Sequence, residues 1–252
     1  MRFATLGSGS KGNATIVEAG GTRVLIDCGF SLKEAQARSE RLAFDLESLD
    51  AVLVTHEHSD HVGGVARLAM ASGIPVYATR GTAAAAEDLK ACEWREITPH
   101  GAFTIGSLEV QPFPVPHDAR EPCQFVFAHA GVRLGILSDV GRITNHVVQV
   151  LSGCDALLLE FNHDAVRLAD GPYPPALKRR VGGDWGHLSN TQAAGLLRAM
   201  DRSRLRQLVL THLSEKNNSP ALARAAACEA LQEDPAWCVC AEQDEGLAWR
   251  DL

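Results

Sequence analysis

The sequence lacks several features that would place it in particular protein classes. No stretch long enough to cross a bilayer is free of charged residues, which argues against a transmembrane helix. Residues 1–7 are too few and too glycine-rich for the apolar part of a signal peptide, and they resemble a first strand that runs into a turn. Internal repeats, low-complexity tracts and obvious linkers are also missing, so we expect one domain spanning residues 1–252.

The cysteines lack the spacing of a disulfide framework. There are seven, an odd number, and none forms a CxxC motif. Cys238 and Cys240 would point to the same face of a strand, but too far apart along it for a relaxed disulfide. We therefore expect free thiols in a reducing compartment and a cytoplasmic protein without membrane contact.

Basic residues are fewer than acidic ones. Lys and Arg number 24 against 31 Asp and Glu, which gives a formal net charge of −7. This balance argues against nucleic-acid binding by global electrostatics alone. It does not exclude a local basic groove, because bound metal ions would add charge that the composition does not count.

Short apolar runs alternate with helical patterns along most of the chain, which indicates an α/β fold. Two mixed sheets packed face to face, with helices outside both, would fit this order, although the pattern alone does not separate it from other α/β layouts. We predict strands at 23–27, 51–55, 75–78, 108–113, 124–128, 132–137, 156–159 and 208–211. We predict helices at 31–42, 62–72, 82–91, 143–151, 190–200 and 221–231.

The most informative segment follows the buried strand at 51–55. His56, His58, Asp60 and His61 lie within six residues. Imidazole and carboxylate groups suit Zn²⁺ and related ions, and this many from one short loop cannot all bind a single tetrahedral ion. Two ions are the natural solution, with His56 and His58 on one and Asp60 and His61 on the other. The alternative is a histidine-rich surface loop.

Further candidate ligands follow other apolar segments. His117 comes after Pro114-Val115-Pro116, Asp139 closely follows the strand at 132–137, and His212 follows the strand at 208–211. A single such residue is more often a cap or a turn residue. Three of them together with the main motif favour a shared metal site.

HxHxDH followed by His, Asp and His in this order resembles the metallo-β-lactamase superfamily, over nearly the whole chain. The resemblance implies a four-layer αββα sandwich with two divalent metal ions, Zn²⁺ or Mn²⁺, at one edge of the sheets. It also implies that Asp139 bridges the ions. One ion is then held by His56, His58 and His117, and the other by Asp60, His61 and His212.

Asp27 closes an early strand, as the aspartate of the superfamily's first motif does. It would orient a ligand histidine, although an aspartate capping the next turn is the alternative. The redox branch of the superfamily usually has Glu at the position of His58, so a histidine there favours hydrolysis.

His187 lies in Asp184-Trp185-Gly186-His187-Leu188-Ser189-Asn190. This segment resembles the part of phosphodiesterase relatives that supplies a histidine near the scissile phosphate, and Glu160 stands where those relatives have its glutamate partner. Such a histidine could stabilise charge or donate a proton. The alternative is a residue that precedes a helix capped by Ser189 or Asn190.

The N-terminal segment 6–13 could place backbone N–H groups around a phosphate, although a plain hairpin turn is equally consistent. It is not a Walker A loop, because the GxxxxGK[ST] spacing fails. Together with 162–164, 186–190 and 211–218 it resembles the bacterial YycJ/WalJ-type family, which is linked to 5′→3′ DNA exonuclease activity. On this basis we name six candidate substrate-binding residues: Ser8, Ser10, Asn13, His163, Ser189 and Asn190.

The spacing between motifs excludes two larger nuclease types. Between His117 and Asp139 there is no room for the long substrate-binding arm of transfer-RNA 3′-processing enzymes. Between Asp139 and His212 there is no room for a β-CASP insertion. Lys178, Arg179 and Arg180 could contact a nucleic-acid backbone, or could simply be a solvated cluster.

The sequence therefore predicts a metal-dependent phosphodiesterase or nuclease that acts on nucleic acid, with DNA favoured, through a hydroxide bridging two ions. We assign catalytic roles to His187, Glu160 and Asp60. One alternative is a thioester, lactone or β-lactam hydrolase on the same metal centre. Another is a partner-binding protein that keeps metal only for folding. Oligomeric state cannot be read from the sequence.

Overall fold

Two units interleave along the chain. In the computed structural model, which describes residues 1–252, the first unit contains Met1–Pro114, Ala119–Val132 and Glu242–Leu252. The second contains Val115–Asp118 and Arg133–Ala241. Each unit contains both strands and helices. The prediction of one domain over residues 1–252 stays a prediction.

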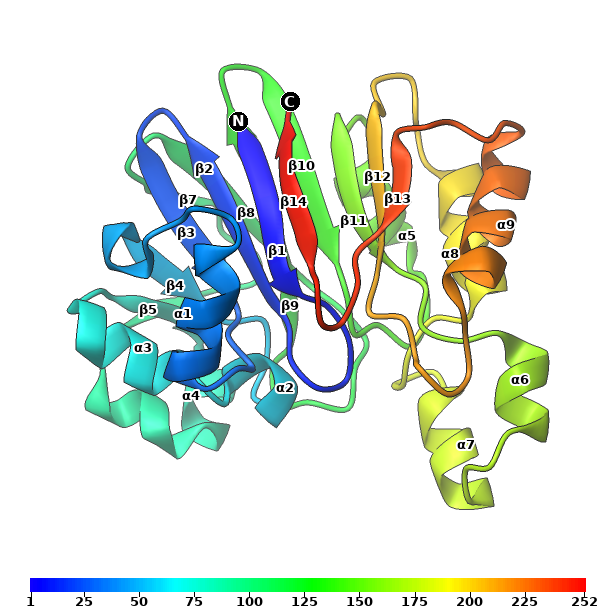
Figure 1. The fold of residues 1–252 in the computed structure, drawn as a ribbon, viewed down its shortest axis with the longest axis horizontal. Coiled ribbons are helices and arrows are strands. Elements are labelled where there is room, and N and C mark those ends of the chain that lie inside the picture. The colour runs from blue at the N-terminus through cyan, green and yellow to red at the C-terminus, as the bar shows by residue number, and fades with distance from the viewer. The chain divides into compact units, whose positions relative to one another are not determined.

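The first unit is built on a mixed sheet with the strand order β14-β1-β2-β3-β4-β5-β6. Strands β14, β1, β2 and β3 are antiparallel neighbours, whereas β3, β4, β5 and β6 are parallel. The two ends of the chain lie side by side here, because β1 pairs with β14 (Figure 1). The strands are β1 (Arg2–Gly7), β2 (Ala14–Ala19), β3 (Thr22–Ile26), β4 (Ala51–Leu53), β5 (Val76–Thr79), β6 (Trp94–Ile97) and β14 (Leu247–Asp251).

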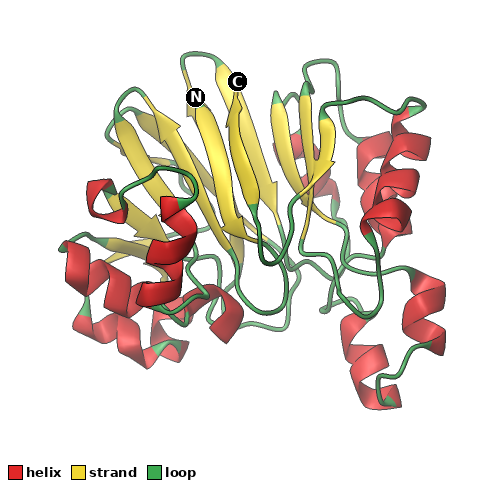
Figure 2. Cartoon of the chain, in the orientation of Figure 1, coloured by secondary structure: helices red, strands yellow, loops and turns green.

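Helices cover one face of this sheet (Figure 2). Apolar side chains from β1, β3 and β4 form a buried cluster with residues of α1 and α3, which excludes water from this face. Ser31 caps α1 by accepting a hydrogen bond from the Glu34 N–H, and Gly73 ends α3 with a φ of 65°. The helices are α1 (Leu32–Glu40), α2 (Ser59–Val62), α3 (Val65–Ser72) and α4 (Arg80–Ala85), with 3₁₀ turns η1 (Leu46–Ser48) and η2 (Glu87–Ala91).

Three antiparallel strands complete the first unit. β7 (Phe103–Ile105), β8 (Leu108–Pro114) and β9 (Cys123–His129) pair in sequence order. They contact the mixed sheet through Phe103, which stacks on Tyr77 at 5.3 Å between ring centroids. The Ser107 hydroxyl also donates to the Ala19 carbonyl at 2.6 Å. These contacts fix the three strands against the mixed sheet within this unit.

The second unit contains the parallel strands β10, β11, β12 and β13. Nearly every side chain of β11 and β12 is buried, which is typical of parallel strands covered on both faces. The strands are β10 (Val132–Leu137), β11 (Ala156–Glu160), β12 (Gln207–Thr211) and β13 (Cys238–Cys240). The helices between them are α5 (Asn145–Leu151), α6 (Ala165–Asp170), α7 (Pro175–Val181), α8 (Asn190–Ala199) and α9 (Pro220–Leu231).

All the predicted strands and helices exist, but two predicted helices are interrupted. The pattern at 62–72 predicted a single helix, whereas the structure has α2 and α3 separated by Gly63 and Gly64. The Gly64 N–H donates to the Cys28 carbonyl at 2.7 Å, and a Cβ at Gly64 would lie 1.8 Å from the Phe30 oxygen. This tertiary contact, which local periodicity does not report, breaks the helix.

The predicted helix at 82–91 is α4 followed by the 3₁₀ turn η2. Five strands and two α-helices were not predicted: β2, β6, β7, β13, β14, α6 and α7. All seven cysteines are free thiols, and burial raises the pKa of Cys28 to about 12. None of the helices has both the length and the apolar character that crossing a membrane requires.

Gly195 offers a test of the packing of α8. It lies inside this helix, and a Cβ built there meets no atom within 4 Å. We expect Gly195→Ala to raise the free energy of unfolding by about 0.5–1 kcal/mol, because alanine loses less backbone entropy in a helix. Urea unfolding followed by circular dichroism would measure it. Gly64→Ala is the contrasting variant and should destabilise; equal effects of the two changes would contradict the packing described.

Candidate metal centre

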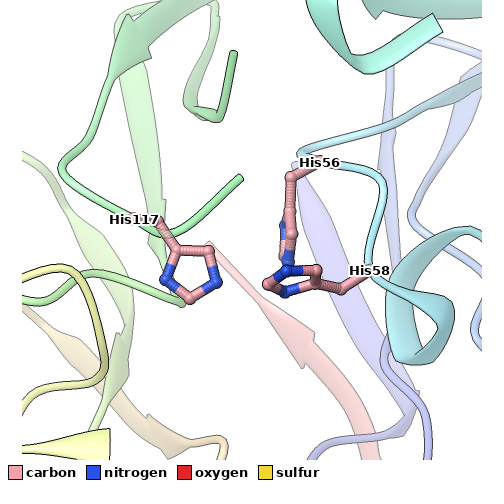
Figure 3. Close-up of side chains that lie close together, drawn as sticks. All are labelled: His56, His58 and His117. Carbon is pink, nitrogen blue, oxygen red and sulfur yellow. The ribbon is translucent and has the colours of Figure 1, made fainter. Parts of the chain in front are cut away.

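The histidine motif lies in the loop after β4, in the first unit. His56 is fully buried, and His58 forms the N-cap of α2 with an extended backbone. Figure 3 shows these two side chains close together, and their ring centroids are 4.7 Å apart. The His56 and His61 rings lie 4.2 Å apart. The loop therefore gathers three imidazoles within one unit, as the spacing predicted.

Asp27 organises this cluster from the end of the neighbouring parallel strand β3. One of its oxygens accepts the Thr55 N–H at 2.8 Å, and the other accepts the Thr55 hydroxyl at 2.7 Å and His61 Nδ1 at 2.8 Å. Thr55 Oγ1 in turn lies 2.9 Å from His56 Nδ1. Because the hydroxyl proton goes to Asp27, His56 Nδ1 donates to the hydroxyl. Both histidines then have the tautomer whose lone pair is on Nε2, which is the nitrogen that binds a metal in this form.

Asn13 also belongs to this cluster. Its side-chain nitrogen lies 3.1 Å from His61 Nε2, and its backbone N–H donates to the Asp60 carbonyl at 2.8 Å. Gly29 approaches the same carbonyl so closely that a Cβ there would lie 2.0 Å from it. The N-terminal loop therefore packs directly on the histidine motif.

The suggestion that this loop presents its N–H groups to a phosphate is wrong for most of them. The Ser8 N–H donates to Glu242 and that of Lys11 to Gln243. The N–H groups of residues 9, 12 and 13 also donate within the first unit. These donors are used by the fold, so the loop supports the histidine motif rather than forming an anion cradle.

In the second unit, candidate residues lie at the carboxyl ends of three adjacent parallel strands. Asp139 follows β10, Glu160 ends β11 and His212 follows β12. Together with His187, each can offer one ligand atom, and these atoms all lie within 4.8 Å of one another. The carboxyl ends of adjacent parallel strands are a common place for ligand sites in α/β sheets, because the loops there converge.

Glu160 positions His187. The Glu160 side chain is fully buried, and its Oε2 accepts the N–H groups of Val140 at 3.2 Å and Leu188 at 3.0 Å. Its Oε1 accepts the His187 Nδ1–H at 2.8 Å. The His187 side chain is 21% exposed, whereas that of Glu160 is fully buried. The contact between Glu160 and His187 that the resemblance implied is present.

His117 lies in the short segment that belongs to the second unit (Figure 3). Its Nδ1 donates to the Gly186 carbonyl at 3.0 Å, and its Nε2 lies 3.9 Å from Asp139 Oδ1. Burial lowers the pKa of His117, although Asp139 acts in the opposite direction. A neutral imidazole with Nδ1 as the donor is the form that binds a metal through Nε2.

The backbone is strained where three of these residues sit. Asp27, Asp139 and His212 have φ values of 59°, 53° and 53°, in the left-handed region that non-glycine residues seldom adopt. Each directly follows a strand or lies two residues beyond one. Strain of this kind is kept where the surrounding structure fixes the residue, and it often marks functional positions.

Two of the predicted substrate-binding residues have local structural roles. Ser189 is the N-cap of α8, where it forms a capping box with Gln192. The Asn190 side chain exchanges hydrogen bonds with Asn218 at 3.0 and 2.9 Å. The capping interpretation of Ser189 is therefore confirmed, while Asn190 is the first residue of the helix.

The other predicted substrate-binding residues differ in exposure. Ser8, Asn13 and His163 are buried, whereas Ser10 is exposed. The Nδ1 atom of His163 has no hydrogen-bond partner within the protein. A buried imidazole nitrogen without a partner can form a hydrogen bond to a group that enters the site, so His163 stays a candidate. Ser10 stays a candidate because it is exposed.

Sequence reasoning missed two supporting residues. Thr55 links Asp27 to His56, and Asn162 places its side-chain nitrogen 3.1 Å from His212 Nδ1. The signal for Thr55 was its position directly before the first histidine. Asn162 was noted only as part of a family segment, and its contact depends on the pairing of β11 with β12.

The donor set fits divalent metal ions. Each unit brings imidazoles and carboxylates together in buried positions. Asp27 is hydrogen-bonded to the His61 ring, and Glu160 to the His187 ring. Borderline cations such as Zn²⁺ take nitrogen and carboxylate ligands of this kind. Buried charged side chains are stable when they are paired with an opposite charge or coordinate a metal ion.

Comparison with known proteins agrees with this arrangement. Residues 22–213 match the family model described as a beta-lactamase superfamily domain. The chain is 35% identical over 237 residues to exodeoxyribonuclease YycJ of Bacillus anthracis, covering 92% of this chain and 90% of that protein. It is 32% identical over 239 residues to exodeoxyribonuclease WalJ of Streptococcus pneumoniae, covering 92% of this chain and 89% of that protein.

Solved structures share the fold. The metallo-beta-lactamase fold protein YhfI from Bacillus subtilis matches with a TM-score of 0.77 and 16% identity, over 99% of this chain and 98% of that one. Zn²⁺-bound PqqB from Methylobacterium extorquens matches with a TM-score of 0.75 and 20% identity, over the whole of both chains. The protein belongs to the metallo-β-lactamase superfamily, in the branch of YycJ and WalJ. The predicted fold class is confirmed, and membership supports a hydrolase.

Asp27→Asn tests whether the hydrogen bonds of Asp27 to Thr55 and His61 support metal binding. Asparagine tolerates a positive φ, but its amide cannot accept hydrogen bonds at both oxygen positions. We expect metal affinity to fall by about 10- to 100-fold, because His61 loses its orienting acceptor. Titration with a metal chelator would measure this. Asp50→Asn removes an exposed carboxylate that accepts only the Arg23 N–H, and it should bind metal like the wild type. Equal affinities in both variants would contradict the orienting role.

His163 allows a test by pH. Burial lowers its pKa below the ordinary value of 6.5, while Glu160 opposes this. The unfolded chain therefore binds more protons than the folded one below about pH 6.5, and stability falls as the pH drops through that range. In metal-free protein, His163→Asn should lose less stability between pH 7.5 and 5.5 than the wild type. Urea unfolding at both pH values would show it, and parallel losses would contradict the burial effect.

Proposed function

We propose that the protein is a metal-dependent phosphodiesterase that degrades DNA from the 5′ end. The observation that carries the proposal is the hydrogen bond between buried Glu160 and His187, beside Asp139 and His212 at the strand ends of the second unit. The exodeoxyribonuclease names of YycJ and WalJ, relatives over 92% of the chain, support the substrate class. A reducing cytoplasmic compartment suits the seven free cysteines.

In this proposal seven residues hold two divalent ions, and Asp139 is shared between them. Bound ions would lower the pKa of a water molecule and neutralise the non-bridging phosphate oxygens. Asp27 and Thr55 keep His56 and His61 in the tautomer that binds metal, and the Gly186 carbonyl does the same for His117. The proposed ligands are His56, His58, Asp60, His61, His117, Asp139 and His212.

His187 is the side chain proposed to act directly on the phosphate during cleavage. Its Nδ1–H is held by Glu160, so Nε2 is the nitrogen that would face the scissile phosphate. There it would stabilise charge on a phosphate oxygen, or give a proton to the leaving oxygen when the ring is protonated. The hydrogen bond to Glu160 fixes the orientation of the ring. Asp60 contributes to catalysis by binding metal, and Ser10 and His163 are proposed to contact the substrate.

The central experiment uses DNA and RNA labelled at one end. We expect DNA with a 5′-phosphate to release mononucleotides from the 5′ end in the presence of Mn²⁺ or Zn²⁺, and chelation to stop the reaction. Product length on denaturing gels would measure direction and step size. Turnover of nitrocefin, acyl-homoserine lactones or lactoylglutathione, with no cleavage of DNA, RNA or bis-p-nitrophenyl phosphate, would instead establish the alternative hydrolase.

His187→Ala separates catalysis from metal binding. We expect kcat to fall by about 10²- to 10⁴-fold while metal content stays at the wild-type level, because His187 is not among the proposed ligands. Metal analysis and rates on bis-p-nitrophenyl phosphate would be measured together. Asp139→Asn is the contrasting variant, and it should lose metal from both positions. A loss of metal in His187→Ala would reassign this residue to the ligand set.

A further inference from the structure

Helix α7 carries positive charge on an otherwise acidic protein. The stretch 171–183 contains Lys178, Arg179 and Arg180 and no acidic residue, whereas the whole chain has a net charge of −7. None of the α7 side chains is buried, so the helix is not held by a packed apolar face. Lys178 donates to the Ala169 carbonyl, and Arg180 is paired with Asp118. Arg179 is exposed and its guanidinium makes no ion pair, so its charge is available for a ligand.

Trp185 is the second unusual feature of this region. It is 59% exposed, more than Trp94, the other exposed tryptophan, at 37%. The exposure does not come from a loose backbone, because the Trp185 carbonyl accepts the Asp118 N–H at 2.9 Å. Large aromatic side chains displayed on a fixed backbone are typical of binding surfaces.

The loop from Gly182 to His187 folds back onto the last turn of α7. The His187 N–H donates to the Val181 carbonyl at 2.8 Å. A Cβ at Gly186 would lie 2.1 Å from the Arg180 oxygen, and one at Gly183 would lie 2.7 Å from the Arg179 oxygen. Only glycine permits this packing. The free guanidinium, the exposed indole and the proposed catalytic imidazole are therefore carried by one fixed segment, residues 178–187.

We propose that residues 178–187 bind a single-stranded polynucleotide beside the bond to be cleaved. Arg179 contacts a backbone phosphate, and Trp185 stacks on an unpaired base next to the phosphate that His187 acts on. An indole stacks on any base, so this surface selects unpaired strands rather than a sequence, and bases within a duplex are not available to it. The inference rests on the proposed phosphodiesterase function and names its preferred substrate.

The test compares a polymeric substrate with a small one. We expect Trp185→Ala and Arg179→Glu each to weaken binding of a single-stranded phosphorothioate oligonucleotide by about tenfold, since one stacked base or one phosphate contact is lost. Fluorescence anisotropy on the metal-loaded protein would measure it. Both variants should keep the wild-type rate on bis-p-nitrophenyl phosphate, which offers neither a base nor a polymeric backbone. Trp185→Phe should retain most of the binding.

Two variants serve as matched controls. Trp94→Ala removes an exposed indole of the first unit, and Arg67→Glu reverses an exposed arginine on α3. Neither should change oligonucleotide binding. Arg179→Glu should also reduce the dependence of the dissociation constant on salt, whereas Trp185→Ala should leave it unchanged.

The inference is overturned if oligonucleotide binding is the same in Trp185→Ala, Arg179→Glu and the controls, or if the rate on the small substrate falls equally. Wild-type protein that hydrolyses no phosphodiester would refute the proposed function. In that case the anisotropy series would still decide whether this surface binds a single strand.

Discussion

The hydrogen bond between a buried carboxylate and an imidazole is the interaction on which the candidate site depends. It occurs once in each unit, between Asp27 and His61 and between Glu160 and His187, both at 2.8 Å. Burying a carboxylate is costly unless donors surround it. Thr55 supplies such donors to Asp27, and backbone N–H groups supply them to Glu160. Each carboxylate is thereby fixed, and it fixes in turn which nitrogen of the histidine faces a ligand.

Within each unit, strand pairing brings the groups of that unit together. Asp27 and the histidine motif follow β3 and β4, which are parallel neighbours, and Asp139, Glu160 and His212 lie at the ends of β10, β11 and β12. A change of register would move every one of these side chains relative to its partner. The left-handed backbone at Asp27, Asp139 and His212 shows that the paired strands hold these residues against their local preference.

The parts that the sequence predicts well are those in which the signal is local. HxHxDH lies within one loop, and the buried strands of both sheets show continuous apolar runs. Edge strand β6 and helix α7 were missed because their side chains are mostly exposed and leave no periodic pattern. The phosphate-cradle interpretation of the N-terminal loop failed for another reason. The N–H groups of Ser8 and Lys11 are satisfied by Glu242 and Gln243, more than 200 positions away in sequence.

The charge distribution limits how a polyanion could reach such a site. A net charge of −7 repels nucleic acid at long range, so affinity must come from contacts within a Debye length of about 8 Å at physiological salt. The acid-free segment around α7 is a local source of positive charge, to which bound metal ions would add. Because the Gly182–His187 loop packs on the last turn of α7, a strand drawn to that helix would already lie beside the histidine proposed to act on it. Repulsion at a distance combined with fixed contacts nearby favours recognition of strand geometry over total charge.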